Sequence, residues 1–413
     1  MRTQSAWYIA IAVVLGTAAT AAAQSAPTDY PQWRGRTRDG SASGFTPPKA
    51  WPENLTRRWK VEVGEGYSTP LVIGTRIYTL TRRDANEVVM ALDTGSGKVL
   101  WQTSYAAPHT IMSGAKNHGQ GPKSTPLFYD NKLFTLGITG IASCVNAADG
   151  KLLWQKPGPS VPTLYANSSM SPIANGSTVI FHMGGHEGGA LTAFDARTGD
   201  VKWAWNGDGP AYASPIIATL AGTPQVITQT QNFMVGVSAE TGELLWQRPF
   251  ANKFSNNAIS PIVLDDMVIM SGYERGVTAF APTKRDGKWT TEVRWDTQEV
   301  SMFMSNPVLV GTTLYGLSQK ASGQFFAIDA KTGKVLWLGP AREATNTSVS
   351  KAGDVLFLLN DDAELVVART DPSKLDVIRR YTVADSVTWA QPVVSGSRLF
   401  IKDSSSLALW TLE

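Results

Sequence analysis

One phrase recurs along the chain and ends in a tryptophan each time. Its pattern is apolar-x-Asp/x-Ala-x-Thr/Asp-Gly-x-apolar-x-Trp, and Ala91-Leu-Asp-Thr-Gly-Ser-Gly-Lys-Val-Leu-Trp101 is one copy. Further copies end at Trp154, Trp203, Trp246 and Trp337, and a degraded copy runs from Ala279 to Trp295. A fixed period means that one supersecondary unit is repeated, which constrains the fold more tightly than composition does.

A second phrase, a small residue followed by proline, opens each unit. It places seven unit starts, at Pro70, Pro126, Pro172, Pro215, Pro261, Pro307 and Pro392. Ser348-Val349 lies at the position expected for the eighth start, although it contains no proline. Successive starts lie 42 to 56 residues apart, so the chain holds eight units.

The sequence pattern of each unit predicts four strands. In the last one, Pro392-Val-Val is a short inner strand, Gly-Ser is a turn, and Arg398-Leu-Phe-Ile is the second strand. The Thr-Gly pairs of the other units predict hairpin turns, with Gly where a positive φ is needed. A period in the forties with four strands per repeat predicts an all-β chain, an eight-bladed β-propeller with four-stranded antiparallel blades.

The regular tryptophans are interpreted as structural. A large flat ring set against the Gly-containing turn of a neighbouring blade would bury about 150–250 Å² and staple the two blades together. This interpretation covers Trp101, Trp154, Trp203, Trp246, Trp295 and Trp337.

The two ends of the repeat region complement each other. Ser406-Leu-Ala-Leu-Trp-Thr-Leu supplies a third strand but leaves no room for a fourth, and Arg57–Val63 is an orphan strand with a docking-type Trp59. Pairing the two would complete the eighth blade and remove the open sheet edge. The predicted organisation is therefore a signal peptide over 1–23, an N-terminal extension over 24–56 and the propeller over 57–413.

The first residues have the pattern of a secretory signal. Arg2 precedes an apolar run from Trp7 to Leu15, and Ala21-Ala22-Ala23 forms a cleavage site. An uncleaved anchor is the alternative, but the run is short of the roughly 20 residues that cross a bilayer. The only cysteine, Cys144, lies too far along the chain to carry a lipid. We expect a periplasmic or secreted protein without stable membrane insertion.

Charge excludes one class of partner. The 37 Lys and Arg residues nearly balance 34 Asp and Glu residues, and no basic run is present. Nucleic-acid binding is therefore not expected.

The repeats resemble the quinoprotein-type (PQQ-like) eight-bladed propeller family, from about Pro31 to the end of the chain. The leader Tyr30-Pro-Gln-Trp33-Arg-Gly, followed by Arg38-Asp-Gly, is similar to secreted bacterial members of largely unassigned function. A more distant resemblance is to the propeller lipoprotein of the outer-membrane β-barrel assembly machinery. The docking phrase specifies the fold and not the chemistry.

The resemblance implies two functions. The dehydrogenases of the family hold pyrroloquinoline quinone (PQQ) with a disulfide of adjacent cysteines, a tryptophan floor, a calcium ion and an aspartate base. Cys144 stands alone, so that disulfide is impossible, and no residue here matches the calcium or base motif. The first hypothesis is an exported binding or scaffold protein, without an expected cofactor, that presents one face to an envelope protein or a small-molecule ligand. The alternative is a PQQ-dependent, calcium-requiring alcohol dehydrogenase-like oxidoreductase, and a weaker third is an oxidoreductase or lyase that uses the histidines.

The loops that lead into the inner strands predict a binding face. The residue three positions before each opening proline should line the mouth of the central channel, which gives Tyr67, Lys123, Ser169, Tyr212, Ala258, Met304 and Trp389. Aromatic rings, a lysine and a methionine around one opening suit a flat or amphipathic ligand, or an extended segment of a partner. The alternative is that the rings simply plug the channel.

The four histidines all lie between His109 and His186. His109 and His118 belong to the long connection from Gln102 to Lys123, and His186 with Glu187 borders a turn one blade further on. We expect His109, His118 and His186 on one face, where imidazoles and a carboxylate could bind Zn²⁺ or Cu²⁺. The spacing matches no standard metal signature, and solvated loop histidines are the favoured alternative.

Overall fold

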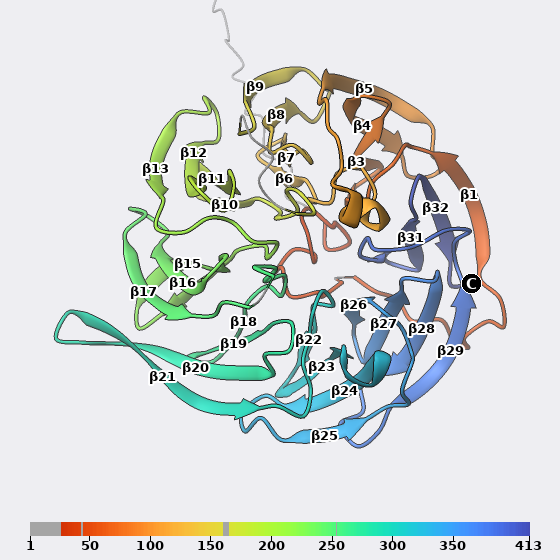
Figure 1. Ribbon diagram of the computed structural model, residues 1–413. Helices are drawn as coiled ribbons and strands as arrows, with labels where there is room; N and C mark the ends of the chain where they lie inside the picture. The colour runs from red at the N-terminus through yellow and green to blue at the C-terminus, as the bar shows by residue number, and fades with distance from the viewer. Residues whose placement is uncertain (1–25, 43, 160–164, 253) are drawn as a thin grey trace, which may run out of the picture.

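Eight four-stranded antiparallel sheets form a closed ring in the computed structural model, which describes residues 26–42, 44–159, 165–252 and 254–413 (Figure 1). The predicted eight-bladed all-β propeller is confirmed. The predicted signal peptide, residues 1–23, lies outside the described residues.

Seven blades use four consecutive strands, ordered from the channel outward. Blade 1 holds β2 (Leu71–Ile73), β3 (Arg76–Arg83), β4 (Asn86–Asp93) and β5 (Val99–Ala106); blade 2 holds β6 (Leu127–Tyr129), β7 (Lys132–Leu136), β8 (Ala142–Asn146) and β9 (Leu152–Lys156). Blade 3 holds β10 (Ile173–Asn175), β11 (Thr178–Met183), β12 (Ala190–Asp195) and β13 (Val201–Trp205); blade 4 holds β14 (Ile216–Leu220), β15 (Thr223–Gln229), β16 (Phe233–Ser238) and β17 (Leu244–Pro249).

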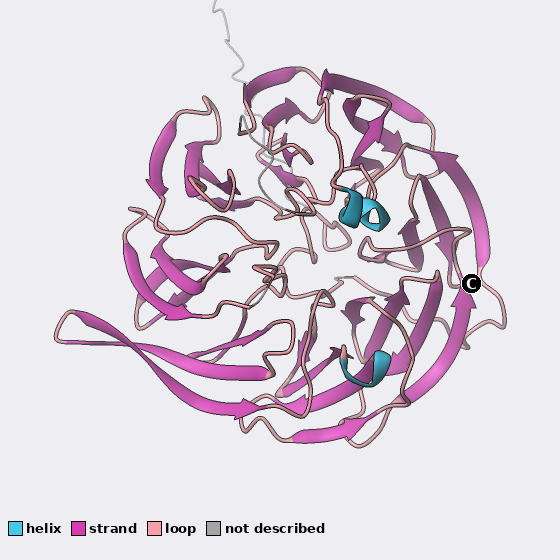
Figure 2. Cartoon of the chain, viewed as in Figure 1, coloured by secondary structure: helices cyan, strands magenta, loops and turns pink. Residues whose placement is uncertain are grey.

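The second half of the ring repeats this plan. Blade 5 holds β18 (Ile262–Leu264), β19 (Met267–Ser271), β20 (Val277–Arg285) and β21 (Lys288–Thr297); blade 6 holds β22 (Val308–Val310), β23 (Thr313–Ser318), β24 (Gln324–Asp329) and β25 (Val335–Leu338). Blade 7 holds β26 (Thr347–Ala352), β27 (Val355–Asn360), β28 (Glu364–Arg369) and β29 (Asp376–Thr382). Two short 3₁₀ segments, η1 (Ser113–His118) and η2 (Lys320–Ser322), are the helices of the described residues (Figure 2).

Blade 8 joins the two ends of the chain. It holds β30 (Val393–Ser395), β31 (Arg398–Lys402) and β32 (Ser406–Thr411), and β1 (Thr56–Glu62) is its outer strand. β1 runs antiparallel to β32, with Glu62 opposite Ser406 and Thr56 opposite Thr411. The predicted closure is confirmed, and it pairs an edge that would otherwise expose unpaired N–H and C=O groups.

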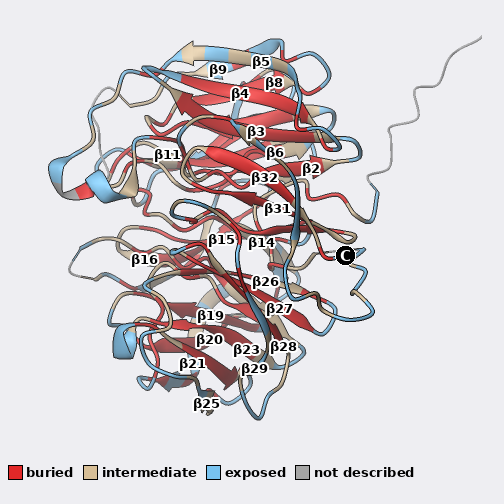
Figure 3. Ribbon diagram, turned by 90° about the vertical axis from the view of Figure 1, so that its right-hand side faces the viewer, coloured by how far each residue is buried: buried red, intermediate tan, exposed pale blue. Residues whose placement is uncertain are grey.

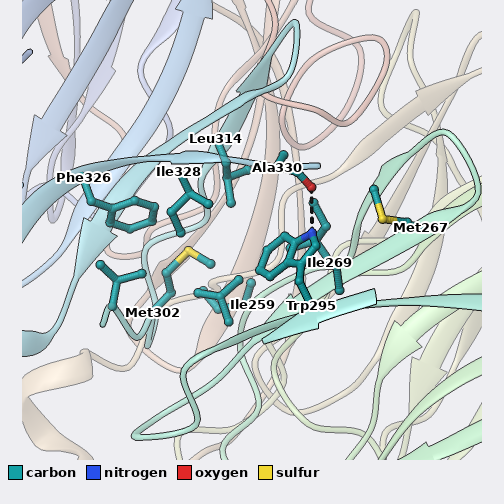
Figure 4. Close-up of a cluster of buried hydrophobic side chains, with 12 residues drawn as sticks. Ile259, Met267, Ile269, Trp295, Met302, Leu314, Phe326, Ile328 and Ala330 are labelled. Atoms are coloured by element: carbon teal, nitrogen blue, oxygen red, sulfur yellow. Dashed lines mark hydrogen bonds between the residues drawn. The ribbon is translucent and has the colours of Figure 1, made fainter. Parts of the chain in front are cut away.

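Burial follows the blades. The second and third strands of each blade are buried almost throughout, whereas several outer strands alternate with exposed residues (Figure 3). The apolar clusters lie between neighbouring blades: the one in Figure 4 joins Ile269 and Trp295 of blade 5 to Leu314 and Phe326 of blade 6. Each blade is therefore held by its neighbours. No helix within the described residues is long and apolar enough to cross a membrane.

Five of the tryptophans lie on a Gly-containing turn of the next blade. The pairs are Trp59 with Gly97, Trp101 with Gly150, Trp154 with Gly199, Trp203 with Gly242 and Trp295 with Gly333. These glycines have positive φ, which disfavours residues with a side chain. A Cβ built on Gly97 would also lie only 2.9 Å from the Trp59 ring, so the contact itself leaves no room for a larger residue. Four of the five indoles donate to a carbonyl of the same turn region; the Trp295 bond to Ala330 O measures 3.0 Å (Figure 4).

Trp246 and Trp337 depart from the predicted docking. Trp246 packs against Gly236 of its own blade and donates to Gln225 Oε1 at 2.6 Å, because the turn glycine of blade 5, Gly287, lies out of contact at the tip of the long β20–β21 hairpin. Trp337 donates to Asp371 O at 2.9 Å, in a turn that contains no glycine. The degraded copy of the repeat phrase between Ala279 and Trp295 was the sequence signal for the irregular docking of Trp246.

Candidate binding site at the channel mouth

The loops that enter the inner strands surround one cavity of about 570 Å³. All seven residues three positions before the opening prolines line it: Tyr67, Lys123, Ser169, Tyr212, Ala258, Met304 and Trp389. Asn346, at the same position before Val349, lines it as well. The repeat thus places eight side chains of seven residue types around one opening.

Below the mouth, a belt of small polar side chains joins consecutive blades. The residue just before each opening proline carries the belt: Thr125 Oγ1, Ser171 Oγ, Ser214 Oγ and Ser260 Oγ each accept a hydrogen bond of 2.9–3.1 Å from the backbone N–H of the equivalent residue one blade earlier. Asn306 continues the belt, and Gln391 N–H donates to Thr69 Oγ1 at 3.1 Å across the point of closure. Sequence reasoning noted these small residues but missed their role.

The leader closes the other end of the cavity. Tyr30 pairs with Val72 of the inner strand of blade 1, and Figure 1 shows the leader, in red, crossing the centre of the ring. Arg38 donates to Pro172 O at 2.8 Å and to Ser171 O at 3.0 Å, on blade 3. Arg34 reaches the opposite side of the ring, where it donates to Asn306 O at 3.2 Å and to Pro307 O. The leader therefore crosses the channel and is held on both sides by these hydrogen bonds.

Trp33 forms the floor of the cavity. Its ring lines the cavity, and the guanidinium carbons of Arg34 and Arg38 each lie 5.5 Å from the ring centroid. This is cation–π distance, so the two buried arginines both hold the indole in place. Burial lowers the pKa of Arg34 to about 10 and that of Arg38 to about 9, since desolvation disfavours the charged form. The sequence singled out Trp33 only through the leader motif.

One sector of the wall joins blades 8, 1 and 2. The Trp389 ring lies 5.1 Å from Tyr67 and 5.1 Å from His118, centroid to centroid. Lys123, next along the rim, donates to Gly119 O at 3.3 Å and to Ala166 O at 3.2 Å. Burial lowers the pKa of Lys123 to about 8, and burial together with Lys123 lowers the pKa of His118.

The opposite sector is also aromatic. Tyr212 accepts a 3.1 Å hydrogen bond from the Ala166 N–H through its hydroxyl, which fixes the ring, and burial raises its pKa. Phe303 lines the cavity and packs edge-on to Tyr273 at 5.0 Å, and Tyr273 in turn packs edge-on to Phe254 at 5.5 Å. Two aromatic clusters therefore face each other across the mouth.

The ionisable side chains of the cavity lining include a cation but no anion among the described residues. Its lining holds Lys123 and four amide side chains, Asn256, Asn306, Asn346 and Gln391, but no Asp or Glu among the described residues. The residues outside the description contain no Asp or Glu in the sequence. Nε1 of Trp389 and Oδ1 of Asn256 are buried without a hydrogen-bond partner in the described part of the chain.

The residues of the hypothetical metal site have different partners in the structure. His118 packs on Trp389 at the mouth, His109 Nε2 lies 3.3 Å from Asn167 Nδ2, and His186 is on blade 3 within the field of Asp208. Glu187 is exposed on the turn between β11 and β12. Within the described residues, no three His, Cys, Asp or Glu side chains are gathered as a metal site would need. The metal hypothesis therefore gains no geometric support.

The lining also fails to match a calcium–quinone centre. Calcium takes about six to eight oxygen ligands, usually with carboxylates among them, and the cavity offers only amide, hydroxyl and carbonyl oxygens. Cys144 lies inside blade 2, away from the lining, and burial raises the pKa of its thiol to about 12. The residues present do not fit the combination of calcium, disulfide and base that the family's dehydrogenases share.

Residues 85–339, more than half of the chain, match the family model described as outer membrane protein assembly factor BamB. The chain belongs to this family. BamB of Shewanella oneidensis is 24% identical over 378 residues, covering 86% of this chain and 88% of that protein. BamB of Yersinia pestis is also 24% identical, over 62% of its own length.

Two further comparisons mark the breadth of the fold. The polyvinylalcohol dehydrogenase of a Pseudomonas species is 25% identical over 339 residues, covering 63% of this chain and 52% of that protein. The crystal structure of BamB from Moraxella catarrhalis superposes with a TM-score of 0.63 at 15% identity, covering 86% of this chain and 97% of that chain. At such identity the structural likeness shows the propeller fold alone.

Proposed function

We propose that this protein is an exported scaffold of the cell envelope that binds a partner protein or a small ligand at the channel mouth. The observation that carries the proposal is the cavity itself. The eight unit starts present aromatic rings, a lysine and amides around one opening, and Trp33 closes the far end. A cavity of this size with apolar walls and a few polar groups is the usual form of a binding site.

Membership of the BamB family supports a role in binding. The family is that of an outer membrane protein assembly factor, and assembly is a role that depends on contacts between proteins. For this chain, the mouth loops are the candidate contact surface, because they carry the exposed and half-exposed aromatic residues that anchor interfaces. Trp389, Tyr67 and Tyr212 are the proposed anchors.

A double variant tests this role. Tyr212→Ala with Trp389→Ala removes one ring from each side of the mouth, and Val99→Ala with Val201→Ala is the matched control on exposed outer strands. Tagged proteins would enrich partners from envelope extracts, with quantification by mass spectrometry. We expect the mouth variant to lose by about tenfold a partner that the wild type and the control both retain. Equal recovery by all three proteins would assign the rings a purely structural role.

The dehydrogenase alternative rests on the likeness to polyvinylalcohol dehydrogenase. It requires PQQ with Ca²⁺ to bind although the lining offers no carboxylate. A rise in melting temperature with quinone plus Ca²⁺, together with dye-linked alcohol oxidation, would favour this alternative. An unchanged melting temperature would favour the scaffold.

A further inference from the structure

Lys123 is the one cationic side chain that lines the cavity within the described residues. Its ammonium group donates to two carbonyl oxygens, Gly119 O and Ala166 O, and an ammonium has three donors. No ion pair between Lys123 and a carboxylate is found in the part of the chain that the structure describes. The third donor is therefore available to a ligand.

The surroundings of Lys123 make an unpaired cation costly to keep. The lining holds no Asp or Glu, and the adjoining rings of Tyr67, His118 and Trp389 shield this sector from water. A buried charge is normally paired, because desolvation is otherwise uncompensated. An anionic group of a ligand would supply the missing partner.

The walls define the body of that ligand. The aromatic cluster of Tyr67, His118 and Trp389 faces Tyr212 and Phe303 across the opening, and the Trp33 indole lies beneath. Flat faces on several sides suit a planar ring system, which gains offset-stacked and edge-to-face contacts. A cavity of about 570 Å³ has room for a fused bicyclic ring.

The charge favours a monoanion. Among the described lining residues, a single ammonium with one remaining donor matches one carboxylate, whereas a phosphate dianion would leave most of its acceptors and half of its charge without partners. We propose that the channel mouth binds an aromatic carboxylate, whose carboxylate meets Lys123 and whose ring lies between the two aromatic walls. This inference rests on the proposed binding role of the mouth and specifies the chemistry of one ligand.

Two probes separate charge from shape. 2-Naphthoate carries the carboxylate, and 2-naphthol has the same ring system without a full charge at neutral pH. Titration of each into the whole protein, followed by calorimetry and tryptophan fluorescence, gives two dissociation constants. We expect 2-naphthoate to bind at least about tenfold more tightly than 2-naphthol, since a charge-assisted hydrogen bond exceeds a neutral one.

Variants assign the preference to Lys123. Lys123→Met keeps the length of the side chain without its charge, and should reduce 2-naphthoate binding about tenfold while leaving 2-naphthol unchanged. Lys123→Arg should retain most of the preference for the carboxylate. Lys151→Met, on an exposed turn of blade 2, is the matched control and should bind both probes like the wild type. Melting temperatures of all four proteins show whether each ring is intact.

Three results would overturn the inference: no binding of 2-naphthoate up to millimolar concentration, equal affinity for both probes, or unchanged affinity in folded Lys123→Met. None of them would remove the proposed scaffold role, because the partner enrichment by the Tyr212 and Trp389 double variant is measured without any aromatic carboxylate. Conversely, a wild-type protein that binds 2-naphthoate but enriches no more partner than the double variant would keep the ligand site and remove the partner role.

Discussion

The guanidinium of Arg38 donates a 2.8 Å hydrogen bond to the carbonyl oxygen of Pro172, which lies 134 positions further along the chain. This contact ties the leader to the third blade, and the Arg34 bonds to Asn306 and Pro307 tie it to the sixth. The leader thereby spans the ring from within, so its removal would open the floor of the cavity and leave inner-strand carbonyls without partners.

We predict that Arg38→Met lowers the free energy of unfolding by about 2–4 kcal/mol, because it leaves two buried carbonyls unpaired and removes one of the two cation–π contacts to the Trp33 ring. Urea titration followed by circular dichroism measures the change. Arg197→Ala, on an exposed turn of blade 3, is the control and should change stability by less than about 0.5 kcal/mol. A loss as small as that of the control would mean that the leader is not part of the folded core.

The closure of the ring makes a second prediction. Trp59→Ala removes the indole that docks on Gly97 across the junction of blades 8 and 1, and should cost about 3 kcal/mol. Gly97→Val places a side chain in the same contact at positive φ and should be at least as damaging. Trp289→Ala, on the protruding β20–β21 hairpin, is the comparison and should cost less. Thermal unfolding ranks the three, and equal losses would argue against closure by docking.

Acid sensitivity is predicted from His182. Burial lowers the pKa of this histidine from 6.5 to about 4, and its Nδ1 lacks a hydrogen-bond partner among the described residues. The unfolded chain therefore binds more protons than the folded chain between these two pH values. The stability contributed by the neutral imidazole is fully present above pH 6.5 and is lost as the pH falls towards about 4.

The difference between wild type and His182→Gln isolates this effect. As the pH falls from 6.5 to about 4, the wild type should lose up to about 3 kcal/mol relative to the variant, at about 1.4 kcal/mol per pH unit. His109→Gln is the comparison, because burial also lowers the pKa of this partly exposed histidine, and it should show a smaller difference. Parallel stability curves for wild type and His182→Gln would show that His182 is protonated in the folded state.

The repeat phrase predicted the ring, its closure and the mouth residues because each depends on spacing. A residue three positions before an opening proline occupies the same place in every unit, so one sequence position was enough to place Tyr67, Tyr212 and Trp389 around one opening. The belt around Thr69 carried the same kind of periodic signal, in the small residue before each proline.

The features that the sequence did not predict lie outside the repeat pattern. Trp33 belongs to the leader, and no periodicity places a single non-repeating segment beneath the cavity. The histidines appeared close in sequence, but His186 lies one blade beyond the connection that carries His109 and His118, and the structure gathers no three ligands within the described residues. The irregular docking of Trp246 follows from a hairpin that is unique to blade 5.

The account's central claim is that the channel mouth is the binding surface, and site-specific photo-crosslinking tests it most directly. A photoreactive residue at Asn346 lies on the lining of the cavity, and one at Val201 lies on the exposed outer strand of blade 3. In intact cells we expect a discrete crosslinked partner or ligand from position 346, none from position 201, and loss of the adduct with Tyr212→Ala and Trp389→Ala. The same adduct from position 201, or one that survives the double substitution, would contradict the claim.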